Sequence, residues 1–182
     1  ARKPKATFDM QLLKLERGLD ETVTEIVRRR RNINRLFESR FGFKLFRDNE
    51  MAITDMRRPC SNEEDFNNRI MALYLLIDQI EVDRLQHHMK NQSSEPGSVN
   101  RLEAFLKENV PGYDRPSVNT LRMIARMRST KYPVHLDDPQ FLSIVAELGY
   151  SIVEPDWQEL WETILQKYLE ALRILEHSVA KK

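Results

Sequence analysis

Apolar residues recur at spacings of three and four along the first forty residues, and this periodicity predicts one long helix from Phe8 to about Arg40. Arg30 interrupts the stripe. Long segments of the chain contain neither glycine nor proline, and only 5 of the 182 residues are glycine. Because a β-sandwich or a β-barrel needs many turns, the sequence predicts an all-α fold. The stripe consists of Leu12, Leu15, Leu19, Val23, Ile26, Ile33 and Phe37.

Capping and turn residues divide the rest of the chain into five further predicted helices. Ser61 and Glu64 form a capping box at the start of the second long helix. The expected fold is therefore a helical bundle of three long and about three short helices. Residues 1–7 are expected to be a flexible basic segment and residues 8–182 a single domain. The five predicted helices cover about 61–89, 98–109, 117–131, 138–149 and 155–179.

Charge and composition exclude several classes of protein. The formal net charge is +1, with 29 basic and 28 acidic residues, so nucleic-acid binding would need a local basic patch. The single cysteine, Cys60, excludes an internal disulfide and a cysteine-rich zinc site. The sequence has no apolar run of membrane-spanning length and no signal-peptide pattern, so we expect a soluble cytoplasmic protein without membrane contact. It begins at Ala1 rather than Met, which favours a trimmed or excised chain.

The main candidate chemistry lies between residues 121 and 138. Val118, Leu121, Ala125 and Arg128 follow a three-four-three spacing, which predicts an inward position for Arg128. A guanidinium on an apolar helix face must find a partner or face a cleft. Two interpretations follow for Arg128: an ion pair with a buried carboxylate that joins two helices, or a phosphate-binding arginine.

A histidine follows this arginine after six intervening residues. The imidazole of His135 can accept a proton near pH 7 and return it. Asp137 and Asp138 are close enough in sequence to raise its basicity. The alternative is a surface-loop or helix-capping histidine. No second histidine lies nearby in the sequence, so neither a metal site nor a cofactor is expected.

This part of the sequence, in an all-helical chain of this length, resembles the HEPN (higher eukaryotes and prokaryotes nucleotide-binding) superfamily. The residues that carry the resemblance are Leu121-Arg122, Arg126-Met-Arg128-Ser129 and Pro133-Val134-His135. Members are small helical bundles with an arginine, usually a polar residue next, and then a histidine after four to six residues. Arg128 matches the arginine, Ser129 the polar neighbour and His135 the histidine. The neighbour is more often Asn, Asp or His, so Ser129 departs from the pattern.

The resemblance implies a metal-independent endoribonuclease with Arg128, His135 and Ser129 as catalytic residues. An RNA 2′-hydroxyl would attack the adjacent phosphorus while His135 assists proton transfer and Arg128 stabilises the phosphoryl oxygens. Many members belong to toxin, phage-defence or RNA-processing systems and form their sites across a homodimer. This implies RNA, a second copy, and a cognate antitoxin or other partner protein as partners. Two alternatives are a non-catalytic interaction module with Arg128 as a structural ion-pair residue, and a coiled-coil regulator built on the first helix.

Other charged residues are candidates for supporting roles. Arg28 and Arg31 share one face of the first helix. This face would either contact a phosphate backbone or be a solvated, salt-bridged surface. Asp78 or Glu81 would orient Arg128 or His135, or would simply be solvated. Further RNA-phosphate contacts are expected from Arg122, Arg126 and Lys131, and the dimer interface from Trp157, Trp161 or the first helix.

Overall fold

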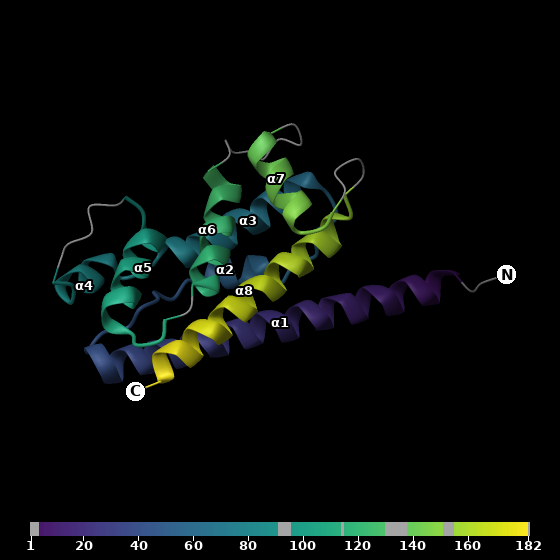
Figure 1. The fold of residues 1–182 in the computed structure, drawn as a ribbon. Helices are drawn as coiled ribbons and strands as arrows, with labels where there is room; N and C mark the ends of the chain where they lie inside the picture. The colour runs from purple at the N-terminus through teal and green to yellow at the C-terminus, as the bar shows by residue number, and fades with distance from the viewer. Residues whose placement is uncertain (1–3, 91–95, 114, 130–137, 151–154, 182) are drawn as a thin grey trace.

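The computed structural model describes residues 4–90, 96–113, 115–129, 138–150 and 155–181. Within these ranges the chain forms eight α-helices, and β-pairing is limited to one isolated bridge (Figure 1). The predicted all-α fold is therefore confirmed. In the part of the chain that is described, no helix is both long enough and apolar enough to cross a bilayer.

Two long helices run side by side in the same direction. They are α1 (Pro4–Phe41) and α8 (Trp157–Ala180). Near the start of the contact, the Gln166 side chain donates to Thr22 Oγ1 at 3.1 Å. Further along, Arg29 forms a 2.8 Å ion pair with Glu176. The N-terminal end of α1 continues past the start of α8 (Figure 1).

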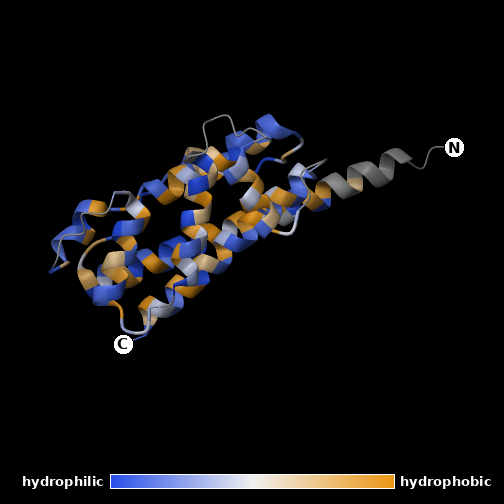
Figure 2. Ribbon diagram, turned by 45° about the horizontal axis from the view of Figure 1, so that its top comes forward, coloured by the Kyte–Doolittle hydropathy of each residue, from blue (hydrophilic) through white to orange (hydrophobic). Residues whose placement is uncertain are grey.

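The remaining helices cover α8 and close the core. Helices α3 (Glu63–Asp78) and α6 (Pro116–Ser129) pack against α8, and α2 (Glu50–Met56) packs on α3. Helices α4 (Val82–His87) and α5 (Ser98–Asn109) contact each other, and α7 (Pro139–Glu147) contacts α6. Hydrophobic and hydrophilic residues alternate along the helices, as expected when each helix buries one face (Figure 2). The largest fully buried side chains of the core include Phe37, Phe66, Phe105, Phe141, Trp161 and Tyr168.

The prediction of a second long helix over about 61–89 is wrong in one respect, because the structure has a break in this helix at residues 79–81. This segment pairs with the chain that follows α1: Arg47 N donates to Gln79 O at 3.0 Å, and Glu81 N donates to Leu45 O at 2.9 Å. These hydrogen bonds divert the backbone, so α3 ends at Asp78 and α4 begins at Val82. The connection expected to be irregular also contains a short helix, α2.

Local capping explains where several helices begin. The cap of α3 is Asn62, one residue after the predicted Ser61, and its side chain accepts a hydrogen bond from Asp65 N at 2.9 Å. The predicted starts of α7 and α8 are confirmed, since Asp138 and Asp156 accept hydrogen bonds from the first-turn N–H groups. Gly149 follows α7 with a φ of 84°, a conformation that favours glycine. Helix α1 begins at Pro4, inside the segment expected to be flexible.

Candidate functional site

Arg128 is exposed, and the expectation that it lies on the inward face of its helix is wrong. The buried positions of α6 are Val118, Leu121, Ile124 and Met127. Met127 therefore occupies the core position that the spacing had given to Arg128. Within the described ranges no carboxylate forms an ion pair with Arg128; instead, its guanidinium carbon lies 4.8 Å from the centroid of the Tyr74 ring.

Three arginines of α6 line a pocket of about 260 Å³ where α6 meets α3 and the start of α5. Tyr74 and Asp78 of α3 form the opposite wall. The Tyr74 hydroxyl donates to Asp78 Oδ1 at 3.2 Å, and the Ser98 hydroxyl donates to the same oxygen at 3.4 Å. Burial, together with the charge of Asp78, raises the pKa of Tyr74, so its hydroxyl stays a proton donor. The three arginines are Arg122, Arg126 and Arg128.

Arg122 is held in place by a buried carboxylate. Its Nη2 donates to Glu103 Oε2 at 2.5 Å and to Asn100 Oδ1 at 3.2 Å. Burial by itself would raise the pKa of Glu103, but hydrogen bonds from Arg122 and Lys107 outweigh it, and this pKa is lowered. Arg115 also pairs with Glu103, at 3.3 Å. The charge of Glu103 is therefore matched by three cations, while Arg128 keeps a guanidinium that no described carboxylate neutralises.

The start of α5 adds to the positive potential of this pocket. Gly97 precedes the helix with a φ of 97°, and its lack of a side chain leaves the first N–H groups without a side-chain cap. These groups carry the partial positive charge of a 12-residue helix. Residues 97–100 line the same pocket as the arginines. The arrangement favours an anion such as a phosphate group.

Of the two candidate carboxylates, one lies at this pocket and the other does not. Asp78 is part of its wall. Glu81 instead accepts two hydrogen bonds from Arg47, at 2.7 and 3.0 Å. The Arg47 hydrogen bonds outweigh burial and lower the pKa of Glu81. Glu81 thus serves to hold the 44–47 segment against the α3–α4 junction.

The other predicted site residues are distributed as follows. Arg28 is exposed and pairs with Glu25 at 2.6 Å, so it belongs to a salt-bridged surface. Arg31 is exposed and has no ion-pair partner among the described residues. Ser129 is the last residue of α6, but its side chain lies outside the described part. Lys131 and His135 also lie outside the described residues.

Arg30 and Asn34 are structural residues whose partners could not be predicted from the sequence. Arg30 is 5% exposed and donates to Tyr168 Oη at 2.9 Å, Leu76 O at 3.0 Å and Arg47 O at 2.9 Å. Asn34 exchanges two hydrogen bonds with the backbone of Phe46, at 2.9 and 2.8 Å. The available sequence signal was the interruption of the α1 stripe by Arg30.

Comparisons with protein-family models, with curated proteins and with solved structures found no match to this chain. Among the described residues, His, Cys, Asp and Glu side chains form no group of three or more that could hold a metal ion. The chemistry of the pocket must therefore be inferred from its own residues, of which the charged and aromatic ones are three arginines, a tyrosine and an aspartate.

Proposed function

We propose that this protein binds the phosphate backbone of RNA at the arginine pocket of α3, α5 and α6, and cleaves RNA as a metal-independent endoribonuclease of HEPN type. The observation that supports this proposal is the environment of the Arg128 guanidinium. Its guanidinium is exposed, faces the Tyr74 ring and has no described carboxylate partner, while Arg122 and Arg126 line the same pocket. A planar guanidinium in this state can donate two parallel hydrogen bonds to a phosphate.

The nucleophile of the proposed reaction is the 2′-hydroxyl of the RNA substrate itself. The hydroxyl oxygen attacks the adjacent phosphorus, the bond from phosphorus to the 5′-oxygen breaks, and a 2′,3′-cyclic phosphate and a 5′-hydroxyl result. His135 accepts the 2′-hydroxyl proton or returns a proton to the leaving oxygen. Arg128 stabilises the charge that develops on the phosphoryl oxygens. We expect the enzyme to act in the cytoplasm, where a cognate antitoxin or other partner protein would control it.

RNA binding by the pocket can be measured separately from cleavage. Fluorescence anisotropy with a labelled single-stranded RNA is expected to show roughly tenfold or greater weakening for Arg128→Ala, since one charge-assisted phosphate contact is lost. Arg28→Ala is the matched control, because Arg28 is also an exposed arginine but is paired with Glu25. Equal affinities of the two variants would contradict the proposal.

A non-catalytic interaction module is the second candidate, and the exposed apolar end of α1 favours it. Met10 and Leu13 are 58% and 65% exposed. The version of this alternative in which Arg128 is a buried ion-pair residue has no support, because Arg128 is exposed. RNA binding without any cleavage, or no RNA binding at all, would favour the interaction module.

A further inference from the structure

Helices α2 and α3 form an antiparallel hairpin whose two ends are joined by side-chain hydrogen bonds. At one end the Asn49 amide donates to Gln79 Oε1 at 3.3 Å. At the other end Arg69 Nε donates to the carbonyl oxygen of Arg58 at 3.3 Å. The start of α2 therefore lies beside the end of α3, and the end of α2 lies near the first turns of α3.

A groove of about 350 Å³ follows the contact between these two helices. The buried alanines Ala52 and Ala72, one from each helix, line it, and their small side chains leave room for a ligand. At the end formed by the start of α2, the lining residues Met51 and Leu75 are 78% and 38% exposed. They are two of the four large apolar side chains that are exposed in the described part of the chain. This end of the groove can therefore accept an apolar group.

The opposite end of the groove carries a buried positive charge. Arg69 lines the groove and is 6% exposed. Its two hydrogen bonds are long, from Nε to Arg58 O at 3.3 Å and from Nη2 to Pro59 O at 3.5 Å. Both acceptors are neutral carbonyl oxygens, and among the described residues no carboxylate forms an ion pair with Arg69. A buried guanidinium with such weak partners favours an anionic ligand.

A comparison with Arg30 shows what Arg69 lacks. Arg30 is also buried, and its guanidinium donates three hydrogen bonds of 2.9 to 3.0 Å to polar groups of the core. It also lies over the Phe46 ring, at 4.3 Å from the ring centroid. The fold therefore satisfies Arg30 internally, whereas Arg69 lies at the wall of a groove with only two long hydrogen bonds.

The other charged residues of the groove favour a ligand with a single negative charge. Arg58 is exposed and forms a long ion pair with Asp55, at 3.5 Å. Together with Arg69, these residues give the groove two positive charges and one negative charge. A carboxylate would balance this excess, whereas a dianionic phosphate would place a further negative charge beside Asp55. A carboxylate also matches the planar fork of a guanidinium.

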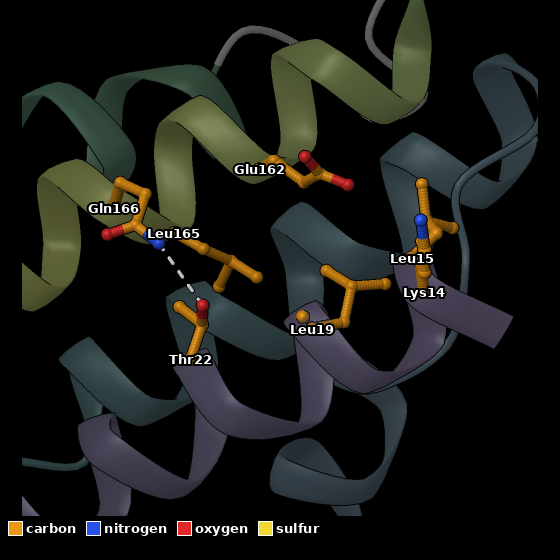
Figure 3. A pocket seen from close by; sticks show the side chains of 8 residues that line it. Lys14, Leu15, Leu19, Thr22, Glu162, Leu165 and Gln166 are labelled. Atoms are coloured by element: carbon orange, nitrogen blue, oxygen red, sulfur yellow. Dashed lines mark hydrogen bonds between the residues drawn. The ribbon is translucent and has the colours of Figure 1, made fainter. Parts of the chain in front are cut away.

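The larger groove between α1 and α8 does not offer this combination. Its volume is about 420 Å³, and Leu15, Leu19 and Leu165 give it apolar walls (Figure 3). Its two charged residues, Lys14 and Glu162, have opposite signs, and neither is buried. It therefore has apolar surface but no excess charge that would orient an anionic ligand.

We propose that the α2–α3 groove binds a medium-chain carboxylic acid, with its carboxylate at Arg58 and Arg69 and its alkyl chain on Met51 and Leu75. The lining residues Asn68 and Leu75 are seven positions apart in α3, which corresponds to about 10 Å along the helix axis. This length suits a medium-chain acid and is too short for a long-chain one. The unbranched side chain of methionine adapts readily to a flexible alkyl chain. No residue lines both this groove and the arginine pocket.

Isothermal titration calorimetry with octanoate tests this site. The unaltered protein is expected to bind octanoate with a dissociation constant below about 1 mM. Octanol, octylamine and acetate should each bind at least roughly tenfold more weakly, because each lacks either the carboxylate or the alkyl chain. An absence of octanoate binding, or equal affinity for any of the other three compounds, would overturn the proposal.

Exposed residues of the groove allow substitutions that leave the core intact. Arg58→Gln removes a charge beside the carboxylate, and Met51→Glu places a charge where the alkyl chain lies, so each is expected to weaken octanoate binding roughly tenfold or more. The matched controls are Arg31→Gln and Leu13→Glu, which change exposed residues of α1 outside the groove. Both controls should bind octanoate like the unaltered protein. Equal affinities of the groove variants and their controls would contradict the assignment.

NMR spectroscopy of protein labelled at the methionine methyl groups locates the bound acid. The resonances of Met51 and Met71, which line the groove, are expected to shift on addition of octanoate. The resonance of Met10, which is exposed on α1, should not shift. Equal shifts at Met10 and Met51 would indicate adsorption to any apolar surface and would refute a specific site. Arg128→Ala should bind octanoate with unchanged affinity, which separates this test from that of RNA binding.

Discussion

The buried guanidinium of Arg30 donates a 2.9 Å hydrogen bond to the hydroxyl of Tyr168, which links α1 to α8 inside the core. Its other hydrogen bonds go to the carbonyl oxygens of Leu76 and Arg47. The Phe46 ring lies 4.3 Å from the guanidinium carbon. One charged side chain thus satisfies polar groups from three separate parts of the chain, and none of these three partners is a carboxylate.

Replacing Arg30 with methionine is expected to lower the free energy of unfolding by about 2–5 kcal/mol, because two carbonyl groups and the Tyr168 hydroxyl lose their donor in a buried environment. Urea denaturation followed by circular dichroism would measure the loss. Arg31→Met is the control. Arg31 is exposed, so its replacement should change stability by about 0.5 kcal/mol or less. Similar losses for both variants would show that the Arg30 hydrogen bonds contribute little.

The core of this fold could be predicted well from the sequence because apolar spacing reports directly on which helix face is buried. Leu19, Val23, Ile26, Ile33 and Phe37 were all predicted to face inward, and all are buried. Helix starts with a local cap were also predictable, since a capping side chain and the N–H group that it binds are a few residues apart. The predicted start of α8 at Asp156 is an example.

Features that depend on distant segments could not be predicted in this way. The break between α3 and α4 arises because residues 79–81 pair with residues 45–47, more than thirty positions earlier. Helical periodicity carries no information about such pairing. The orientation of Arg128 was also missed. Spacings of three lead from Leu121 through Ile124 to Met127, which are buried, whereas the predicted spacing of four after Leu121 led through Ala125 to Arg128. Apolar spacing allowed both continuations, and the wrong one was predicted.

Glu103 should make stability depend on pH in the acidic range. Its pKa in the folded protein is lowered from the usual 4.5, and this contribution to stability is fully present above that value. It is lost as the pH falls through the folded pKa. Thermal unfolding between pH 7 and pH 3 is expected to show a smaller fall in melting temperature for Glu103→Gln than for the unaltered protein. Parallel curves would indicate that Glu103 is not held ionised by Arg122.

Cys60 is expected to resist alkylation in the folded protein. Burial raises the pKa of its thiol to about 12, with a further contribution from Asp65, so the reactive thiolate is scarce at neutral pH. Iodoacetamide at pH 8 should label the native chain slowly and the urea-unfolded chain rapidly, as measured by mass spectrometry. Equal labelling rates would show that the region around Cys60 opens readily.

Tyr74 should help RNA binding by positioning Arg128. Tyr74→Leu removes the ring beneath the guanidinium and is expected to weaken RNA binding about two- to fivefold, the size of a partly exposed cation–π contact. Tyr74→Phe keeps the ring and should bind within about twofold of the unaltered protein. Anisotropy titrations of both variants would measure the difference. Equal weakening would assign the effect to the hydroxyl and its hydrogen bond to Asp78 instead.

Cleavage of a defined RNA in the presence of a chelator tests the proposed function most directly. The unaltered protein is expected to cleave and to leave a 2′,3′-cyclic phosphate, while Arg128→Ala and His135→Ala each lower the rate by about two orders of magnitude or more. Arg28→Ala should cleave at the rate of the unaltered protein, and a strand with 2′-deoxyribose at the cleaved position should stay intact. No cleavage by folded, RNA-binding protein, or cleavage that persists in both Arg128→Ala and His135→Ala, would contradict the assignment.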